Sequence, residues 1–324
     1  MESAAREVRE AVFIAVRDTL GDSILLSGGL DTGIVLAAAT ESQRTEPGDL
    51  RTYTVVLQGV PAPDLEFSRA VSKHFRVPLV THAMSLAELE GCLPEVVKVL
   101  RTFDPMEVRN SVAVYVGMKR ARLDGRAKIM TGDASDELFA GYSFVFNLPK
   151  EKARESLFHL WEVMHFSSIP LAASLGMEAR LPFLHPKVRE VAESLDFSLL
   201  NGKRPGSGEL TGKYVLRKAF EDILPPEIVW RPKTPIENGS GTTALPRIYS
   251  EMTSDAEFTQ KREEYLGKDG VRLRDKEQLR YYRIYRELFG PPGPVDPSQR
   301  ACPACTSNVP RGATFCTTCG EYPI

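Results

Sequence analysis

The stretch GDSILLSGGLDTGIVLAAAT, residues 21–40, places a glycine pair between a short apolar run and an apolar helical pattern. SILL (23–26) predicts a buried strand, and TGIVLAAAT (32–40) predicts the start of a helix. Backbone N–H groups in such a turn, together with the helix N-terminus, can bind an anion. The turn has neither the lysine of the GxxxxGKS/T loop nor the GxGxxG spacing, so it is neither of these two common phosphate loops.

Strand and helix patterns alternate further along the chain. TYTVVLQ (52–58) and AKIMTGD (127–133) predict buried strands, while DLEFSRAVSKHFRV (64–77) and RNSVAVYVGMKRARLDG (109–125) predict helices. From residue 142 to about 290, helical patterns and turns dominate and no comparable strand is expected. The sequence therefore predicts an α/β fold with a doubly wound parallel sheet and a helical C-terminal part.

Length and composition fit a globular chain of about two domains, with 324 residues of which 42% are hydrophobic. FGPPGPVDPSQRA (289–301) contains four prolines and two glycines, as is typical of an extended linker. We predict a catalytic domain over 1–290, a linker over 291–300 and a small module over 301–324. A net charge of −2 gives no general attraction to nucleic acid or membranes. With an amphipathic first helix and no run of ~18 apolar residues, a cytoplasmic protein is expected.

Two motifs carry a family resemblance. SGGLDT (27–32) resembles the pyrophosphate-binding loop of the PP-loop ATP pyrophosphatases, and TGDASDELFAGY (131–142) is similar to the SGEGxDExFGGY signature of asparagine synthetases. Four more segments resemble that family in the same order: 103–125, 177–188, 216–241 and 275–289. The resemblance covers residues 1–289. It implies the synthetase domain, which cleaves ATP between the α and β phosphates to adenylate a carboxylate.

The resemblance also implies site residues, with ATP and Mg²⁺ as cofactors. Asp31 and Asp136 match two aspartates at the pyrophosphate and metal, and oxygen ligands suit Mg²⁺. Lys233, in WRPKTPIENGSG (230–241), is expected to stabilise adenylation, and Asp133 to accept a proton. Arg109 is the third expected catalytic residue, with an ordinary ion pair as the alternative. The ATP and pyrophosphate cradle is expected to comprise Ser27, Gly28, Gly29, Asp31, Thr32, Thr131 and Gly132.

Several positions depart from the family pattern. Asp133 stands in place of glutamate and is one methylene shorter, and Ala134 stands in place of glycine. VMHFSSIPLAASLGM (163–177) lacks the acidic residues that could face an amino-acid ammonium group, which puts aspartate in doubt as the substrate, although Glu162 or Glu178 could supply a counter-charge. His185 replaces an aspartate and is expected to be structural.

The sequence before the first predicted strand is about twenty residues long and begins with Met-Glu. A glutaminase domain, which the family's glutamine-dependent members carry, is not expected there. Ammonia is then expected from solution or from a separate glutaminase subunit, or else another amine is the nucleophile.

Four of the five cysteines lie in CPACTSNVPRGATFCTTCG (302–320), which resembles a zinc ribbon. Cys302, Cys305, Cys316 and Cys319 are expected to bind a structural Zn²⁺ as thiolates, with redox pairs or disulfides as the alternative. A closed site of this kind is structural or a docking element for a partner protein or peptide. Cys92 is expected to be a buried residue on a helix.

We therefore predict an ATP-dependent ligase that adenylates a carboxylic acid and transfers the acyl group to ammonia or another amine. Two alternatives stay open. One is a PP-loop enzyme that modifies tRNA, although thiolating types need a reactive cysteine pair in the catalytic domain and Cys92 is alone there. The other is a binding module without activity, in which the altered residues 133 and 134 mark lost catalysis.

Overall fold

A computed structural model describes residues 1–45, 49–294 and 296–324 of the chain. The chain divides into two units, which we describe separately. Unit 1 comprises residues 1–56, 62–82 and 117–235, and unit 2 comprises residues 57–61, 83–116 and 236–324. Position 295 of the predicted linker lies outside the described residues, and the predicted bounds of the catalytic domain and the small module stay a proposal.

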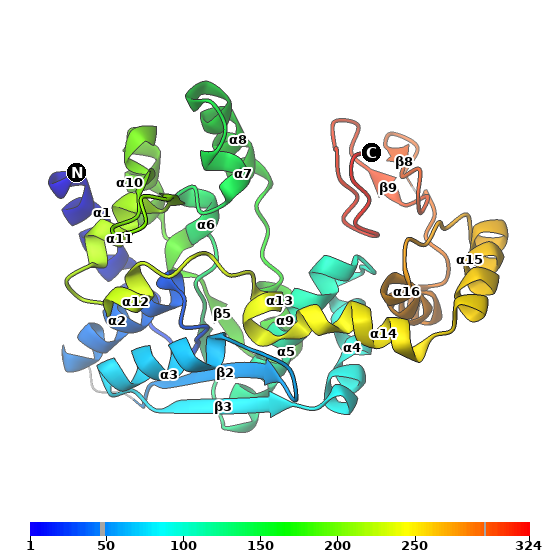
Figure 1. Cartoon of the computed structure of the whole chain (residues 1–324), viewed down its shortest axis with the longest axis horizontal. Helices are drawn as coiled ribbons and strands as arrows, with labels where there is room; N and C mark the ends of the chain where they lie inside the picture. The colour runs from blue at the N-terminus through cyan, green and yellow to red at the C-terminus, as the bar shows by residue number, and fades with distance from the viewer. Residues whose placement is uncertain (46–48, 295) are drawn as a thin grey trace. The chain divides into compact units, whose positions relative to one another are not determined.

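The main sheet has five strands in the order β3-β2-β1-β4-β5. Their bounds are Ser23–Leu25 (β1), Arg51–Leu57 (β2), Leu79–Met84 (β3), Lys128–Met130 (β4) and Glu178–Arg180 (β5). β1 pairs in parallel with β2 on one side and β4 on the other, and β4 pairs in parallel with β5. Figure 1 shows β2 and β3 side by side and running in the same direction. The predicted α/β fold with a parallel sheet is confirmed.

β5 corrects the expectation that no strand comparable to the predicted ones lies between residue 142 and about residue 290, because it belongs to the same sheet. It is only three residues long, and its sequence, Glu-Ala-Arg, has no apolar run. β3 was not predicted either. Most of its residues are only partly buried or exposed. Both are edge strands of the sheet. Edge strands need fewer apolar side chains than central ones, so a search for apolar runs misses them.

Helices of unit 1 surround this sheet. The amphipathic helix α1 (Glu2–Asp18) packs against α2 (Leu30–Thr45), α10 (Pro186–Ser194) and α11 (Tyr214–Phe220). The side chain of His185 accepts a hydrogen bond from Lys187 N at the start of α10, so this histidine is a cap, in line with its predicted structural role. The remaining elements are α3 (Asp64–Phe75), α6 (Ser135–Leu138), α7 (Ser143–Phe146), α8 (Lys150–Val163), α9 (Ser168–Ser174), α12 (Pro226–Val229), the 3-10 turns η1 (Pro182–Leu184) and η2 (Phe197–Leu199), and the hairpin of β6 (Asn201–Lys203) and β7 (Leu210–Gly212).

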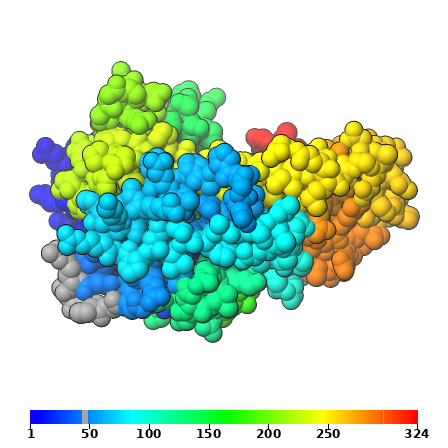
Figure 2. Space-filling model, turned by 60° about the horizontal axis from the view of Figure 1, so that its bottom comes forward, coloured from blue at the N-terminus to red at the C-terminus, as the bar shows by residue number. Residues whose placement is uncertain are grey.

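Unit 2 is mainly helical. Figure 2 shows α14 (Leu245–Met252) and α15 (Asp255–Asp269), in yellow, beside α16 (Lys276–Phe289), in orange. α16 also packs against α4 (Leu86–Leu100), in which Cys92 is buried as predicted. The other elements are the part of α5 (Pro105–Leu123) up to residue 116, α13 (Ile236–Ser240), η3 (Thr242–Ala244), and the short pair β8 (Arg300–Ala301) and β9 (Asn308–Val309). Among the described helices of the chain, none is long and apolar enough to cross a membrane.

Candidate functional site

The candidate site lies at the carboxyl ends of β1 and β4. These strands are neighbours in the sheet, although β2 and β3 come between them in the sequence. In open α/β sheets, the loops after two such strands diverge and leave a crevice where ligands bind. Residues 26–29 follow β1 and residues 131–134 follow β4, so the two predicted motifs meet at this point.

Gly28 shows why the first loop requires glycine. Its φ of +67° is in the left-handed region, and a Cβ there would lie 2.3 Å from the backbone of Phe67 and Ser68 in α3. A side chain at position 28 would therefore push the loop away from α3. The loop is also fixed from within, because Gly29 N donates to Ser27 Oγ at 3.2 Å and Ser27 Oγ lies 3.2 Å from Thr32 Oγ1.

The two aspartates predicted to hold Mg²⁺ meet at a buried lysine. Lys213 Nζ lies 2.7 Å from both carboxylate oxygens of Asp31 and 2.7 Å from Asp136 Oδ1. Although 41% of the Lys233 side chain is exposed, its ammonium group donates to Asp136 Oδ2. Ser135 Oγ donates to Asp31 Oδ1 at 2.7 Å. Two carboxylates and two ammonium groups thus form one cluster whose formal charges balance.

This cluster keeps the carboxylate of Asp136 ionised. Burial would raise the pKa of Asp136, but Lys213 and Lys233 outweigh it and lower that pKa to about 2. Burial likewise opposes the charge of Lys233, but Asp136 and Asp31 raise its pKa above the ordinary value. The side chain of Lys213 is only 4% exposed, so its charge depends on these partners.

Lys213 is a site residue that the sequence analysis did not identify. It precedes α11 in the segment LTGKYVLRKAF, where a lysine gives no local sign of a distant partner. Its partner Asp31 lies 182 positions earlier in the chain. Only the fold shows that the two residues meet.

Asp133, the predicted proton acceptor, lies next to the cluster in the second loop. Thr131 Oγ1 donates to Asp133 Oδ2 at 2.9 Å, and Ser168 Oγ, from the start of α9, donates to the same oxygen. Burial raises the pKa of Asp133, and the two hydroxyl groups and Lys233 only partly oppose this. A carboxylate of raised pKa is a better proton acceptor than an ordinary aspartate. Ser168 was not predicted; it lies in the segment noted for its lack of acidic residues.

Gly132 separates Thr131 from Asp133 and lies close to the first loop. A Cβ on Gly132 would lie 2.8 Å from the Cβ of Asp31. The absence of a side chain at this position therefore lets the two loops approach each other.

Two buried arginines hold the loop that carries Lys233. Arg231 Nη1 donates to the carbonyl of Ser27 at 3.0 Å, Arg231 Nη2 donates to Asp64 Oδ1 at 2.6 Å, and the guanidinium lies over the ring of Phe67. Arg217 in turn donates to the carbonyl of Arg231 at 3.1 Å. Arg231 thus connects the glycine loop at Ser27, the first turn of α3 and the loop that carries Lys233.

The Asp64–Arg231 pair should leave a signature in the pH dependence of stability. Burial raises the pKa of Asp64 to about 6, although Arg231 opposes this. The folded state then binds the proton more tightly than the unfolded state does. Its stability contribution is greatest below about pH 4 and is lost as the pH rises through 6. Between pH 4 and 7, we expect the unfolding free energy of the wild type minus that of Asp64→Asn to fall by about 2–3 kcal/mol. Denaturant titrations measure this, and a constant difference would contradict it.

The alanines at positions 134 and 140 stand where the family signature has glycine, and both adopt left-handed backbone conformations, with φ of 74° and 53°. Such a conformation costs an alanine about 1–2 kcal/mol. Both methyl groups are buried, which offsets part of that strain. The two alanines thus hold a backbone conformation that glycine adopts more readily.

Arg109 lies in unit 2, where carboxylates surround it. Its Nε donates to Glu237 at 3.1 Å and its Nη1 to Glu277 at 2.9 Å. Glu277 is 2% exposed, and burial raises its pKa to about 7 although Arg109 opposes this. This is the ion pair named as the alternative for Arg109, and the predicted catalytic role stays a prediction.

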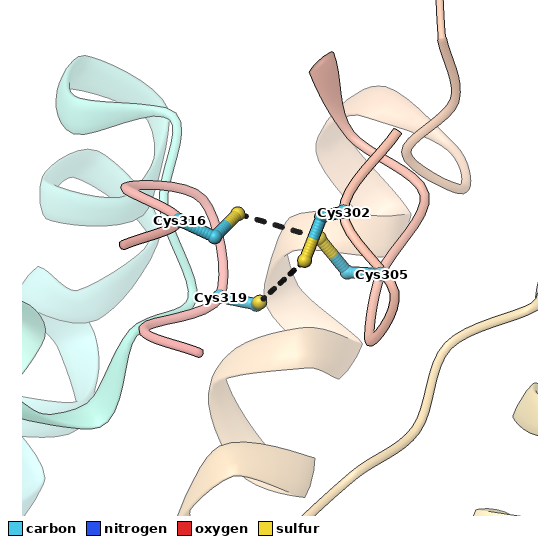
Figure 3. A group of neighbouring side chains, drawn as sticks. All are labelled: Cys302, Cys305, Cys316 and Cys319. Atoms are coloured by element: carbon cyan, nitrogen blue, oxygen red, sulfur yellow. Dashed lines mark hydrogen bonds between the residues drawn. The ribbon is translucent and has the colours of Figure 1, made fainter. Parts of the chain in front are cut away.

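The four clustered cysteines are also in unit 2, and Figure 3 shows their sulfur atoms pointing toward one another. The Cys302–Cys319 and Cys305–Cys316 sulfur distances are 3.8 and 3.7 Å, and all four atoms lie within 4.8 Å of one another. A disulfide needs ~2.05 Å, whereas a tetrahedron with ~2.3 Å zinc–sulfur bonds has edges of about 3.8 Å. The four thiols therefore have the spacing of a tetrahedral metal site.

Comparisons with known proteins identify relatives of this chain. The chain is 27% identical over 304 residues to a probable glutamine-hydrolyzing asparagine synthetase of Dictyostelium discoideum, covering 86% of this chain and 54% of that protein. It is 27% identical over 314 residues to asparagine synthetase B of Escherichia coli K12. This match covers 90% of this chain and 55% of that protein. The chain thus spans about half the length of the curated relatives it matches.

Among solved structures, a U34-tRNA thiolase of Methanococcus maripaludis aligns with 95% of this chain and 83% of its own, with 11% identity and a TM-score of 0.32. The family model described as asparagine synthase matches residues 4–168 and 170–290, which include both motifs of the candidate site. The chain therefore belongs to the asparagine synthase family.

Proposed function

We propose that this chain is an ATP-dependent ligase that forms an amide through an acyl-adenylate. One observation carries the proposal: the cluster of Lys213, Asp31, Asp136 and Lys233 lies at the carboxyl ends of β1 and β4, with Asp133 beside it. Such a cluster supplies fixed charges for a leaving pyrophosphate and a base for the second step. The names of the relatives, which are asparagine synthetases, support the same reaction class.

In the first step, a carboxylate oxygen of the substrate attacks the α-phosphorus of ATP, and the bond to the β-phosphate oxygen breaks. The products are an acyl-adenylate and pyrophosphate. Negative charge develops on the leaving group, where the ammonium groups of Lys213 and Lys233 stabilise it. The N–H groups of the loop at Ser27, Gly28 and Gly29, with the hydroxyl of Thr32, form the cradle for the pyrophosphate, and Thr131 and Gly132 approach the ribose and α-phosphate.

Asp31 and Asp136 supply the oxygen donors that suit Mg²⁺, which would neutralise phosphate charge when bound. The positive charges of Lys213 and Lys233 already balance the negative charges of Asp31 and Asp136. The two aspartates therefore suit a cation that binds together with the nucleotide, because the phosphates bring additional negative charge.

In the second step, an amine attacks the acyl carbon and AMP leaves. The amine loses a proton, and Asp133 is positioned to accept it, with its pKa raised by burial. The hydrogen bonds from Thr131 and Ser168 hold Asp133 Oδ2 and so orient the carboxylate.

Product analysis tests this proposal. With a panel of carboxylic acids and amines, Mg²⁺ and ATP, we expect AMP and pyrophosphate in equal amounts together with an amide. ADP and phosphate would reject adenylation. Turnover only with tRNA would favour the tRNA-modifying alternative, and ATP binding without turnover would favour a binding module. The same panel decides whether aspartate is used and whether ammonia, a separate glutaminase or another amine supplies the nitrogen.

We further propose that Cys302, Cys305, Cys316 and Cys319 bind a structural Zn²⁺ as four thiolates. The sulfur spacing supports this ion, and four protein ligands leave no position open for catalysis. Docking of a partner on this segment and a cytoplasmic location stay predictions.

Replacing Lys233 with alanine should reduce the rate of adenylation by about 10²–10³-fold, because its charge acts chiefly on the transition state. ATP binding should weaken much less. Steady-state kinetics and nucleotide titration measure the two effects, with Lys187→Ala, an exposed lysine on α10, as the control. Equal losses in rate and affinity would show that Lys233 is only a uniform binding contact.

A further inference from the structure

The segment that contains the second cysteine pair, Cys316 and Cys319, is hydrogen-bonded to the N-terminal ends of two helices of unit 2, α5 and α16. At the start of α5, Thr102 Oγ1 donates to the carbonyl of Thr317 at 2.8 Å, and Phe103 N donates to the carbonyl of Thr318 at 2.8 Å. At the start of α16, Gln278 Nε2 donates to the carbonyl of Cys319 at 2.8 Å. Residues 317–319, which form the turn at the second cysteine pair, therefore contact both helix ends.

Gly320 shows how closely this turn packs. Its φ of +75° is left-handed, and a Cβ at this position would lie 2.2 Å from Asp104 Oδ1. Arg274 Nη1 donates to the carbonyl of Gly320 at 2.8 Å. A segment that is merely tethered by a linker would not need this fit, so the contacts favour a fixed position within unit 2.

The same two helix ends hold the partners of a buried ion pair. Asp104 begins α5, because its Oδ1 accepts a hydrogen bond from Met106 N, and Arg109 follows one turn later. Gln278 is adjacent to Glu277, whose carboxylate accepts from Arg109 at 2.9 Å. The cysteine-containing turn thus contacts the residue next to Glu277 and residues five to seven positions before Arg109.

We propose that a metal ion bound by the four cysteines clamps the N-terminal ends of α5 and α16 and thereby positions the Arg109–Glu277 ion pair. This inference rests on the proposed Zn²⁺. Within the segment, β8 and β9 pair over only two residues each. Without a metal, a module of this size lacks the core to fix its turns. Thr317, Thr318 and Cys319 would then no longer present their carbonyl groups to the helix ends.

The first experiment compares the full-length wild type with Cys316→Ser by zinc analysis and amide hydrogen exchange. The wild type should contain about one Zn²⁺ per chain and the variant much less. In the variant, exchange should accelerate at least about 10-fold in peptides covering 102–109 and 276–281. Peptides from α1 and α2 in unit 1 should be unchanged. Cys92→Ala, which removes a thiol outside the cluster, is the control.

A second variant keeps the test valid if Cys316→Ser does not fold. Thr102→Val with Gln278→Met leaves all four thiols in place but removes three hydrogen bonds to the turn. It should keep its Zn²⁺ and still show faster exchange at 102–109 and 276–281. No zinc in the wild type would overturn the metal assignment. If the wild type contains zinc but amide exchange is unchanged in both variants, the metal assignment stands and the proposed positioning of the helix ends is wrong. The same conclusion follows if exchange accelerates equally throughout both units.

Discussion

Replacing Asp136 with asparagine is expected to reduce AMP formation on the order of 10³-fold or more. Asp136 pairs with both Lys213 and Lys233, so its loss misplaces the two ammonium groups that we propose to stabilise the pyrophosphate, and it removes one of the proposed oxygen donors for the cation. Asparagine keeps the shape of the side chain. The loss is therefore one of charge, and it should appear in the rate more than in the affinity for ATP.

Steady-state measurement of AMP and pyrophosphate at several Mg²⁺ concentrations tests this expectation. Glu190→Gln, which removes an exposed carboxylate from α10, is the matched control and should retain activity. Circular dichroism should show that both variants are folded. If Asp136→Asn kept its turnover at ordinary Mg²⁺, the assignment of this residue to the cation and pyrophosphate would be wrong.

Replacing Lys213 with methionine is expected to destabilise the chain by about 3–5 kcal/mol at pH 7, because the buried carboxylate of Asp136 and the partly buried carboxylate of Asp31 lose their shared partner. Methionine has a similar length, so the change removes charge rather than volume. Lys233 remains to balance only part of the charge. Activity should also be lost, but the stability effect is independent of any substrate.

The pH dependence of this loss has a definite sign. In the wild type, the pKa of Asp136 is about 2, despite burial, so its ionised form stabilises the fold above about pH 4 and this contribution is lost as the pH falls through 2. Without Lys213, burial should raise the pKa of Asp136 above its value in the unfolded chain. The variant should therefore lose stability as the pH rises from about 4 to 7. Denaturant titrations at both pH values measure this, and parallel pH profiles for the two proteins would contradict it.

The local pattern of the sequence was sufficient for the central strands β1, β2 and β4 and for the glycine loop. These features depend on interactions between near neighbours or on complete burial, which leaves an apolar run in the sequence. The edge strand β5 left no such run and was missed. The four cysteines were also readable from spacing alone, because both pairs lie within one short segment.

The candidate site itself was predicted only in part. Asp31, Asp133, Asp136 and Lys233 belong to motifs that the sequence displays, whereas Lys213, Ser168 and Arg231 became site residues only in the fold. No short-range pattern indicates that a lysine will contact an aspartate 182 residues away.

By itself, the sequence determined which chemical groups this chain carries: a glycine turn of the kind that can bind an anion, the carboxylates and a four-thiol group. The tertiary structure decided which charged side chains contact one another inside the protein. It brought Lys213 between Asp31 and Asp136, and it placed Arg109 against Glu237 and Glu277. The physical reason is that a charge can be buried only with a partner, and the order of strands and helices in space selects that partner, whatever its distance along the chain.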